Sequence, residues 1–500
     1  MSEWQHIAVG LALSLAGWCG LRAAVGARLR PRIAPLLDAS IPGGAFALLL
    51  IATGKPVFAG ILLAALMAAF AAADRMKRAI LREPIVFTDF CQTIDVLFRH
   101  PELNMLGSRK VIVLPALAAA VGALASLVVV EPGLWPWSPR QALLAAAIAA
   151  LAIGLAGGPC LGFVSSCLRH LRPTGEPAAD IANLGPFAAQ AAYIAIAKAE
   201  RQQRRDRCLP RCAIAASGRA AAAPVVVVQA ESFFDPRGVW PDMPRELLSA
   251  FDACRGGSIQ HGRLAVPAVG ANSVRTEFAM LTGLPEEALG FDRFNPYLAF
   301  ARQPVRSLAW RLRDEGYRTI CLHPFDPRFY RRDLVMKALG FDAFLDEEAF
   351  WGAARSGHFV DDRELALRIA DIVRDEGPRV FVFAITMQNH GPWRGRDGGC
   401  ERFLQGIRET DAMLARLMET LERQATDAVL ALYGDHPPAL RPVLARLSEN
   451  PSTEYVIWSP AGGRRNGERD LAAHELSAAI WDAWATAGRH AAEARPMSSR

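Results

Sequence analysis

The chain has 500 residues, of which 52% are hydrophobic and 21% are charged. This composition excludes a disordered chain, and the length excludes one small domain. The formal net charge is +6 and unevenly distributed: residues 1–170 hold 14 basic and 8 acidic residues, whereas residues 171–500 hold 42 of each. A basic excess confined to the first third argues against a nucleic-acid-binding surface and for two parts in different surroundings.

Five apolar stretches follow one another through the first third of the chain. Each holds roughly 17 to 23 residues with almost no charge, enough for a helix to cross about 30 Å of hydrocarbon. We therefore predict transmembrane helices over residues 7–25, 33–53, 57–73, 111–130 and 142–164. The second is the weakest, because it contains Asp38, Pro42 and two glycines. A cleaved signal peptide is the alternative for the first, but no Lys or Arg precedes it.

The whole chain then divides into a transmembrane domain over residues 1–167, a helical linker over 168–221 and an α/β domain over 222–490. The polar stretch 74–110 between the third and fourth spans is either an interfacial segment facing anionic lipid or a solvated loop. Cys208 and Cys212 could form a disulfide. Structural zinc is not expected, because no second cysteine pair stands at zinc-site spacing.

From residue 222 onward, short β-branched runs alternate with amphipathic helices. The strands are predicted over residues 225–228, 318–322, 380–386, 428–432 and 455–458, and helices over 304–315 and 400–424. Strands that are apolar throughout and alternate with helices indicate a mostly parallel sheet covered on both faces.

Polar residues suited to metal or phosphate chemistry follow the ends of four of these strands. Glu231 follows the first, His323 the second, His390 the third, and Asp435 with His436 the fourth. The carboxyl ends of parallel strands meet at one edge of a sheet, where such folds bind ligands. One histidine after a strand is usually an ordinary surface residue, but five such residues on one edge predict a site. Two carboxylates and an imidazole suit a divalent ion such as Mn²⁺ or Zn²⁺.

Ser273 is the candidate nucleophile. The apolar spacing from Val274 to Leu281 predicts a helix with Asn272 or Ser273 at its N-cap. An ordinary capping serine is one interpretation. The other is a hydroxyl that faces free backbone N–H groups at the positive end of the helix, where a phosphate would bind and a metal ion would lower the hydroxyl's pKa.

Taken together, these motifs resemble the lipoteichoic acid synthase family of membrane phosphoglycerol transferases, within the sulfatase and alkaline phosphatase superfamily. The resemblance is carried by residues 225–236, the Gly-x-Asn-Ser-x-x-Thr-Glu-Phe-x-x-Leu-Thr-Gly run from Gly270 to Gly283, Asn389-His390-x-Pro and Tyr433-Gly-Asp-His. It implies five amino-terminal spans followed by an extracytoplasmic α/β domain of the alkaline phosphatase and sulfatase type. Residues 81–89 also resemble a stretch found after the third span in this family.

The resemblance implies roles for the strand-end residues. Glu231, Asp435 and His436 would bind one divalent ion, with Mn²⁺ preferred and Mg²⁺ or Zn²⁺ as alternatives. Ser273 would be the nucleophile and a further ligand of that ion, at a position where the family usually has threonine.

A second set of residues would bind the substrate. The run Tyr330-Arg331-Arg332-Asp333 resembles an aromatic-x-Arg-Asp segment that binds the head-group phosphate and glycerol, with Tyr330 in place of a familiar tryptophan. Arg332 would clamp the phosphate, since a planar guanidinium holds two oxygens at once. Asp326, in the loop before this run, is a further candidate substrate-binding residue.

The activity expected from the resemblance is a double displacement. Ser273 would attack phosphatidylglycerol, diacylglycerol would leave, and the phosphoglycerol group would pass from Ser273 to a glycan or polyol-phosphate acceptor. His390 or His323 would exchange the protons. The protein would lie in a bacterial cytoplasmic membrane with its catalytic domain in the periplasm and would bind no nucleic acid. Its oligomeric state is left open.

Three alternatives were weighed. Phosphoethanolamine transfer uses the same superfamily scaffold and is the nearest competitor. A phosphodiesterase or sulfatase of the same superfamily is a further alternative, of which the formylglycine-type sulfatase is disfavoured, because Ser273 is followed at two and four positions by Arg275 and Glu277 instead of Pro and Arg. A transporter or sensor whose soluble domain only binds ligand would show no dependence on a divalent ion.

The basic residues conflict with the expected topology. A periplasmic domain after five spans needs a cytoplasmic amino terminus, which places the basic clusters of residues 22–32 and 75–110 outside. The positive-inside rule favours the reverse. We follow the resemblance, because basic interfacial segments could bind the anionic lipids of the outer leaflet.

Overall fold

A computed structural model of the chain describes residues 2–28, 34–90, 99–100, 110–135, 141, 144, 147, 167, 170–208, 222–240, 243–395, 397–447, 450–462 and 467–494. The chain forms two compact units. One comprises Met1–Thr93 and Asn104–Glu200, and the other comprises Ile94–Leu103 and Arg201–Arg500. Each unit is described by itself.

The first unit is helical. Its helices are α1 (Glu3–Ala24), α2 (Ala34–Thr53), α3 (Pro56–Leu81), α5 (Lys110–Val130), α7 (Pro177–Leu184) and the start of α8 (Pro186–Cys208). Three of them, α1, α2 and α3, are long and apolar enough to cross a membrane. The fourth predicted span coincides with α5, whereas residues 142–164 and the cysteine pair 208 and 212 fall largely or wholly outside the described side chains. The number of five spans therefore stays a prediction.

Glycines set the close approach of α1 and α3. A side chain on Gly10 would place its Cβ 2.0 Å from the carbonyl oxygen of Pro56, and one on Gly60 would place its Cβ 2.2 Å from the carbonyl oxygen of Gly10. Apolar helices gain little from burial against each other in lipid, so backbone packing through small residues is how such helices associate.

Asp38 in α2 organises one end of this unit. Its Oδ1 accepts the N–H groups of Phe187 and Ala188 at 2.7 and 2.9 Å, and its Oδ2 accepts Trp18 Nε1 at 2.8 Å and Arg22 Nη1 at 2.7 Å. Asp38, which made the second span the weakest prediction, thus has hydrogen-bond donors on both of its carboxylate oxygens. The end of α1, the start of α2 and the start of α8 consequently lie together, one helix length from the start of α1.

The second unit is built on one mixed sheet with strand order β10-β2-β9-β8-β1-β7-β3-β4, in which β11 also pairs with β2. Its strands are β1 (Val225–Ala230), β2 (Gln260–Ala265), β3 (Arg318–Leu322), β4 (Ala343–Leu345), β7 (Val380–Ile385), β8 (Val429–Gly434), β9 (Ser452–Trp458), β10 (Gly467–Glu468) and β11 (Leu471–Ala472). A separate hairpin pairs β5 (Arg355–Ser356) with β6 (Phe359–Val360).

The central strands β8, β1, β7, β3 and β4 are parallel, as predicted. The predicted strand at residues 455–458 is present as β9, but it runs antiparallel to β8 and to the unpredicted strand β2. Strand β2 was missed because its sequence, Gln260-His-Gly-Arg-Leu-Ala, is mostly polar.

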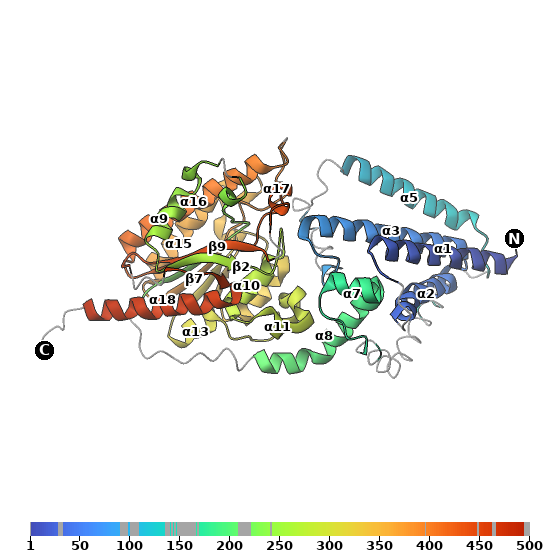
Figure 1. The fold of residues 1–500 in the computed structure, drawn as a ribbon, viewed down its shortest axis with the longest axis horizontal. Coiled ribbons are helices and arrows are strands. Elements are labelled where there is room, and N and C mark those ends of the chain that lie inside the picture. Colours follow the sequence, from blue (N-terminus) through green and yellow to red (C-terminus); the bar gives the residue numbers. More distant parts are fainter. Residues whose placement is uncertain are drawn as a thin grey trace. The chain divides into compact units, whose positions relative to one another are not determined.

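Helices cover both faces of this sheet (Figure 1). Alternate residues of β1 enter two different cores: Val225 and Val227 pack with α10, α13 and α18, whereas Val226 and Val228 pack with α9, α15 and α16. Two covered faces explain why the strand is apolar throughout. The helices are α9 (Ser249–Gly256), α10 (Ser273–Thr282), α11 (Glu286–Leu289), α12 (Pro296–Phe300), α13 (Leu308–Asp314), α14 (Arg332–Ala338), α15 (Asp362–Glu376), α16 (Cys400–Gln424), α17 (Arg441–Leu444) and α18 (Ala473–Ala494).

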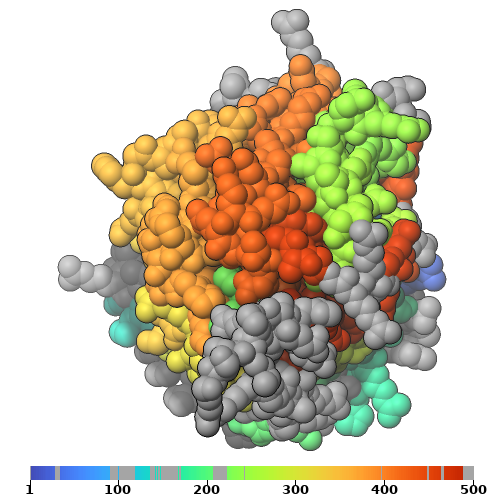
Figure 2. Space-filling view, turned by 90° about the vertical axis from the view of Figure 1, so that its left-hand side faces the viewer, coloured from blue at the N-terminus to red at the C-terminus, as the bar shows by residue number. Residues whose placement is uncertain are grey.

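Segments far apart in the sequence adjoin on the surface of this unit. Figure 2 shows one face on which the chain near residue 250 (green), the chain near residue 360 (yellow-orange) and the chain beyond residue 400 (orange to red) pack against one another. Their contact follows from α9, α15 and α16 sharing one core on the same side of the sheet.

Candidate active site

The structure brings the five strand-end residues to the carboxyl edge of the parallel strands. Glu231 directly follows β1, Asp435 and His436 follow β8, His323 follows β3, and His390 lies in the loop after β7. These strands are neighbours in the order β8-β1-β7-β3. Residues separated by more than 200 positions in the sequence therefore share one edge.

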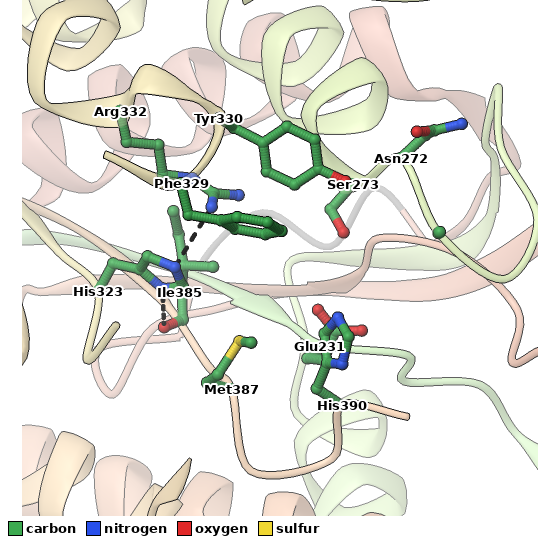
Figure 3. A pocket seen from close by; sticks show the side chains of 11 residues that line it. Glu231, Asn272, Ser273, His323, Phe329, Tyr330, Arg332, Ile385, Met387 and His390 are labelled. Atoms are coloured by element: carbon green, nitrogen blue, oxygen red, sulfur yellow. Dashed lines mark hydrogen bonds between the residues drawn. The ribbon is translucent and has the colours of Figure 1, made fainter. Parts of the chain in front are cut away.

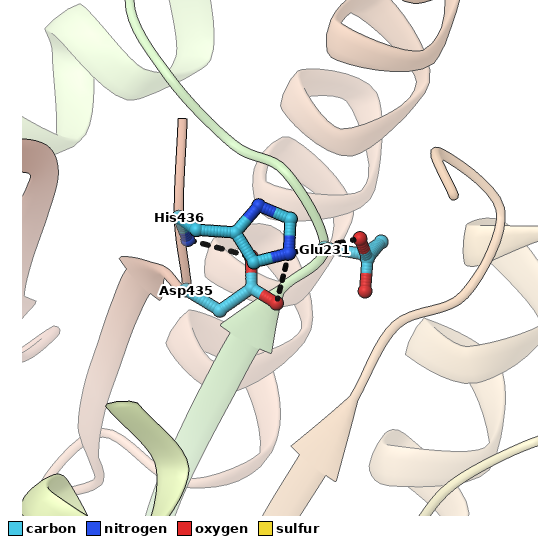
Figure 4. Close-up of side chains that lie close together, drawn as sticks. All are labelled: Glu231, Asp435 and His436. Atoms are coloured by element: carbon cyan, nitrogen blue, oxygen red, sulfur yellow. Dashed lines mark hydrogen bonds and ion pairs between the residues drawn. The ribbon is translucent and has the colours of Figure 1, made fainter. Parts of the chain in front are cut away.

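Glu231, Asp435 and His436 form a buried cluster that could hold a metal ion (Figure 4). Each offers a ligand atom, and these atoms lie within 4.8 Å of one another. His436 Nε2 is 3.6 Å from Glu231 Oε1 and 3.5 Å from Asp435 Oδ2. These separations leave room for an ion that would be shared by all three groups.

Asp435 shows most directly that the cluster suits a cation. Its Oδ1 accepts the backbone N–H groups of Ser232 and His436 at 2.8 and 2.9 Å, but its buried Oδ2 has no hydrogen-bond partner. A buried carboxylate oxygen without a donor is costly unless a cation satisfies it. Burial, and then the charge of Asp435, raise the pKa of Glu231 to about 8. Two buried carboxylates side by side repel each other unless a cation lies between them, so the residues present fit a divalent ion.

Neighbouring elements hold the ligands in place. Ser232 has a positive φ of 54°, and this turn lets its N–H reach Asp435 directly after β1. The backbone N–H of Glu231 donates to Thr386 Oγ1 at 2.8 Å, and Thr276 Oγ1 donates to the carbonyl oxygen of Asp435 at 2.7 Å. Three elements thus position the cluster.

Ser273 is the first residue of α10, as the apolar spacing predicted. Asn272 precedes it in the left-handed region, with φ 65° and ψ 37°, and makes no side-chain capping bond. Asparagine tolerates this conformation better than most residues. Ser273 is 8% exposed and lines the same pocket as Glu231, and Figure 3 shows its hydroxyl pointing into that pocket toward Glu231.

The same pocket contains most of the predicted substrate and proton-transfer residues. It is lined by Glu231, Ala271, Asn272, Ser273, His323, Phe329, Tyr330, Arg332, Ile385, Met387 and His390 (Figure 3). The lining therefore combines charged and polar groups with apolar and aromatic side chains, a mixture that suits a ligand with both a phosphate and an apolar part.

Arg332 is held by a residue that sequence reasoning did not assign. Glu277 accepts Arg332 Nε at 3.2 Å and Nη2 at 2.8 Å, and both side chains are almost completely buried. Glu277 also accepts Gln229 Nε2 at 3.0 Å and the hydroxyl of Tyr297. A sequence signal existed: Glu277 stands one helical turn after Ser273 and directly before the apolar run Phe278–Leu281, where an unpaired charge would be costly.

His323 is oriented by its two neighbours. Its Nδ1 lies 3.3 Å from the carbonyl oxygen of Ile385 and its Nε2 lies 3.3 Å from Arg332 Nη1. A carbonyl only accepts and a guanidinium only donates, so Nδ1 carries the hydrogen and Nε2 accepts from Arg332. Burial, together with the charge of Arg332, holds the pKa of His323 well below its usual value. The ring is therefore neutral and already engaged.

Asp326 is not among the residues that line the pocket. Its Oδ1 accepts the backbone N–H and Nε of Arg328 at 2.9 and 3.0 Å, and its Oδ2 accepts Arg328 Nη2 at 2.9 Å. The role of Asp326 as a direct substrate-binding residue remains a prediction. Its observed contacts are with the loop that carries Tyr330.

A protein-family model described as Sulfatase matches residues 224–483, the second unit with its sheet and site. The chain belongs to the sulfatase family. This sulfatase-family chain is 29% identical over 455 residues to the capsular polysaccharide biosynthesis protein RkpI of Rhizobium meliloti (strain 1021), covering 87% of this chain and 84% of that one. It is also 31% identical over 279 residues to a putative cyclic beta-1,2-glucan modification protein of the same strain, covering 51% of this chain but only 41% of that relative.

A solved structure shares the fold of this sulfatase-family chain. The integral membrane protein lipooligosaccharide phosphoethanolamine transferase A of Neisseria meningitidis aligns with a TM-score of 0.52 and 13% identity over 96% of both chains. The chain is thus a sulfatase-family enzyme with helices long and apolar enough to cross a membrane ahead of its α/β sulfatase-family domain.

Proposed function

We propose that the protein transfers phosphoglycerol from phosphatidylglycerol to a hydroxyl of a glycan or polyol phosphate, through a covalent phosphoglycerol group on Ser273. The observation that carries this proposal is one pocket that contains the Ser273 hydroxyl, the Glu231 carboxylate of the metal cluster and the Arg332 guanidinium. A nucleophile, a cation site and a phosphate clamp are the parts that phosphoryl transfer needs.

Glu231, Asp435 and His436 would hold a divalent ion, with Ser273 as a further ligand. Two carboxylates and one imidazole suit Mn²⁺, with Mg²⁺ and Zn²⁺ as alternatives. When bound, the ion would lower the pKa of the Ser273 hydroxyl and offset negative charge on the phosphoryl oxygens.

The chain's own residues account for the bonds and protons. Ser273 Oγ forms a bond to phosphorus as the bond from phosphorus to the diacylglycerol oxygen breaks, and Arg332 holds the phosphoryl oxygens. The proton of the Ser273 hydroxyl passes to the diacylglycerol oxygen. An acceptor hydroxyl then bonds to phosphorus, the bond to Ser273 Oγ breaks, and the acceptor's proton returns to Ser273.

We assign proton transfer to His390 in preference to His323. The lone pair of His323 accepts from Arg332, so this ring serves to orient the guanidinium. His390 lines the pocket, and its Nδ1 donates to the carbonyl oxygen of Gly391, which directs proton exchange to Nε2. An imidazole in the pocket can carry a proton in both half-reactions.

The pocket favours a glycerol head group over an ethanolamine one. Among its lining residues that the structure describes, the carboxylate is Glu231, which belongs to the metal cluster. A primary ammonium would find no carboxylate of its own there. The hydroxyls of glycerol could bond to the hydroxyl of Tyr330, the amide of Asn272 and Arg332.

The acceptor and the location complete the proposal. The names of the two Rhizobium relatives refer to a capsular polysaccharide and a cyclic glucan, which supports a surface or periplasmic glycan as acceptor. Within the first unit, Asp38 joins the start of α8 to the end of α1, at the end of this unit opposite Glu3. With a cytoplasmic amino terminus, the catalytic domain would lie in the periplasm, on the outer side of the cytoplasmic membrane.

To test the proposal, purified protein is incubated with Mn²⁺ and with phosphatidylglycerol labelled on its glycerol head group. Wild-type protein should release diacylglycerol and retain the label covalently, whereas Ser273→Ala should do neither. Ser273→Thr keeps the hydroxyl and should retain activity, which controls for damage to the fold. Full turnover by Ser273→Ala would exclude the assignment, and labelling by phosphatidylethanolamine alone would favour the phosphoethanolamine alternative.

A further inference from the structure

The loop between β3 and α14 delivers two pocket residues in a strained conformation. Tyr330 and Arg331, directly before Arg332, have φ values of 57° and 59°. Non-glycine residues are uncommon in this region and persist only where their surroundings hold them. The position of Tyr330 and Arg332 therefore depends on what holds this loop.

Part of the support lies within the loop itself. Asp326 accepts three hydrogen bonds from Arg328, and the N–H of Phe329 donates to the carbonyl oxygen of Asp326 at 3.1 Å. Burial alone would raise the pKa of Asp326, but the hydrogen bonds from Arg328 outweigh it and hold that pKa below its usual value. Asp326 is thus a fixed carboxylate at the centre of the turn.

The other support is His100, which stands more than 200 residues earlier, between α3 and α5 in the sequence. Its Nε2 lies 3.5 Å from Asp326 Oδ2. Its ring centroid lies 4.9 Å from that of Phe325 and 5.2 Å from that of Phe329, edge-on to the latter. His100 is 7% exposed, so these contacts enclose it.

These contacts reach one residue of the pocket lining. Phe329 lines the pocket and, with Phe325 and Met387, forms a small apolar core separate from the two large cores of the sheet. Phe329 also packs on Tyr330, with ring centroids 4.4 Å apart. His100 therefore contacts Phe329 itself and, in the same loop, Phe325 and Asp326.

We infer that His100 is a positioning residue of the active site: it holds the Asp326–Arg331 loop, and through it Tyr330 and Arg332, in the shape that receives the head group. The segment between α3 and α5 thereby helps to support the site that would bind the lipid donor. A buried histidine that served only stability would be replaceable by any residue that preserved the fold. A positioning residue affects the loop and the binding of the donor.

The decisive measurement is hydrogen–deuterium exchange of backbone amides in the intact, purified protein without substrate. His100→Ala should speed exchange in peptides covering residues 324–331 by roughly tenfold or more, since the loop loses its outer support, while β1 and β8 exchange as in wild type. His100→Phe keeps ring packing without the contact to Asp326, and His100→Gln keeps a polar group without the ring; each should restore part of the protection. Asp375→Asn, at an exposed position on α15, is the control and should leave the exchange of these peptides unchanged.

A second measurement, the steady-state kinetics of His100→Ala, rests on the proposed function. With phosphatidylglycerol as donor, His100→Ala should raise KM by about tenfold with a much smaller change in kcat, because the clamp is misplaced but Ser273 is not. Wild-type protein that is inactive on phosphatidylglycerol would refute the proposed function and leave the exchange result standing. Unchanged loop exchange in His100→Ala, or equal effects on every element of the unit, would overturn the inference about His100.

Discussion

Glu277 binds Arg332 through both carboxylate oxygens, at 3.2 Å from Nε and 2.8 Å from Nη2. The two side chains are 0% and 3% exposed. This pair fixes the edge of the guanidinium that faces away from His323, while the remaining nitrogen, Nη1, lies 3.3 Å from His323 Nε2. A phosphate clamp is most effective when its orientation is set before the substrate arrives.

Replacing Glu277 by Ala should destabilise the protein by about 3 to 5 kcal/mol, because it leaves the Arg332 charge buried without its partner. Glu277→Gln keeps the shape and should cost less stability, yet it should lower kcat/KM because the guanidinium is held more weakly. Denaturant unfolding and steady-state kinetics measure the two effects. Glu286→Gln weakens a partly exposed ion pair with Arg275, which lies on α10 like Glu277. This variant should cost less than about 1 kcal/mol. Equal losses of stability in Glu277→Ala and Glu286→Gln would contradict the prediction.

The metal cluster makes a prediction that needs no substrate. Mn²⁺ should raise the unfolding temperature of the wild-type protein, because an ion that binds only the folded state stabilises it. Asp435→Asn should abolish that rise, since the unpartnered Oδ2 is lost as a ligand. Glu454→Gln alters another buried carboxylate, which accepts the N–H of Asp235 at 2.8 Å outside the cluster, and should keep the rise. A full Mn²⁺ response in Asp435→Asn would show that the ion binds elsewhere.

Asp362 at the start of α15 should make stability depend on pH. Burial raises the pKa of Asp362 from 3.8 to about 7, against a hydrogen bond from Thr410 that lowers it. Between these two values the folded state binds more protons than the unfolded state, so stability falls as the pH rises through about 4 to 7. Above pH 7 the penalty is fully present, at about 1.4 kcal/mol per pKa unit.

Replacing Asp362 by Asn should therefore stabilise the protein at pH 8 and have little effect at pH 4. Thermal unfolding of both proteins across this range measures the difference. Asp375→Asn removes an exposed carboxylate from the same helix and should show no such trend. A constant difference between Asp362→Asn and wild type at every pH would count against a titrating buried carboxylate.

Gly406 in α16 leaves space for the side chain of Asn389, the residue that precedes His390. A Cβ at Gly406 would lie 2.0 Å from Asn389 Oδ1, which also accepts Trp393 Nε1 at 3.0 Å. Gly406→Ala should push Asn389 aside, cost about 1 to 3 kcal/mol through overpacking, and lower kcat through the displaced His390. Gly256→Ala in α9 meets open space and should be harmless. Kinetics and unfolding of the two variants provide the comparison, and an active, stable Gly406→Ala would show that the loop adapts.

Much of the fold could be predicted because its determinants are local. Strands β1, β3, β7 and β8 are runs of apolar residues, and their order of appearance with helices implies a parallel sheet. The orientation of β9 was not predictable in this way, because its pairing with the mostly polar strand β2 depends on where two distant segments meet.

The sequence by itself determined which residues could do the chemistry: Glu231, Ser273, Asp435 and His436 stand at strand or helix ends, and such positions follow from local patterns. Only the tertiary structure decided how these residues are supported. Glu277 meets Arg332 across 55 positions, and His100 meets Asp326 across more than 200. Such contacts depend on long-range packing. The sequence offers many possible partners for one buried charge or ring, and only the folded chain shows which of them lies beside it.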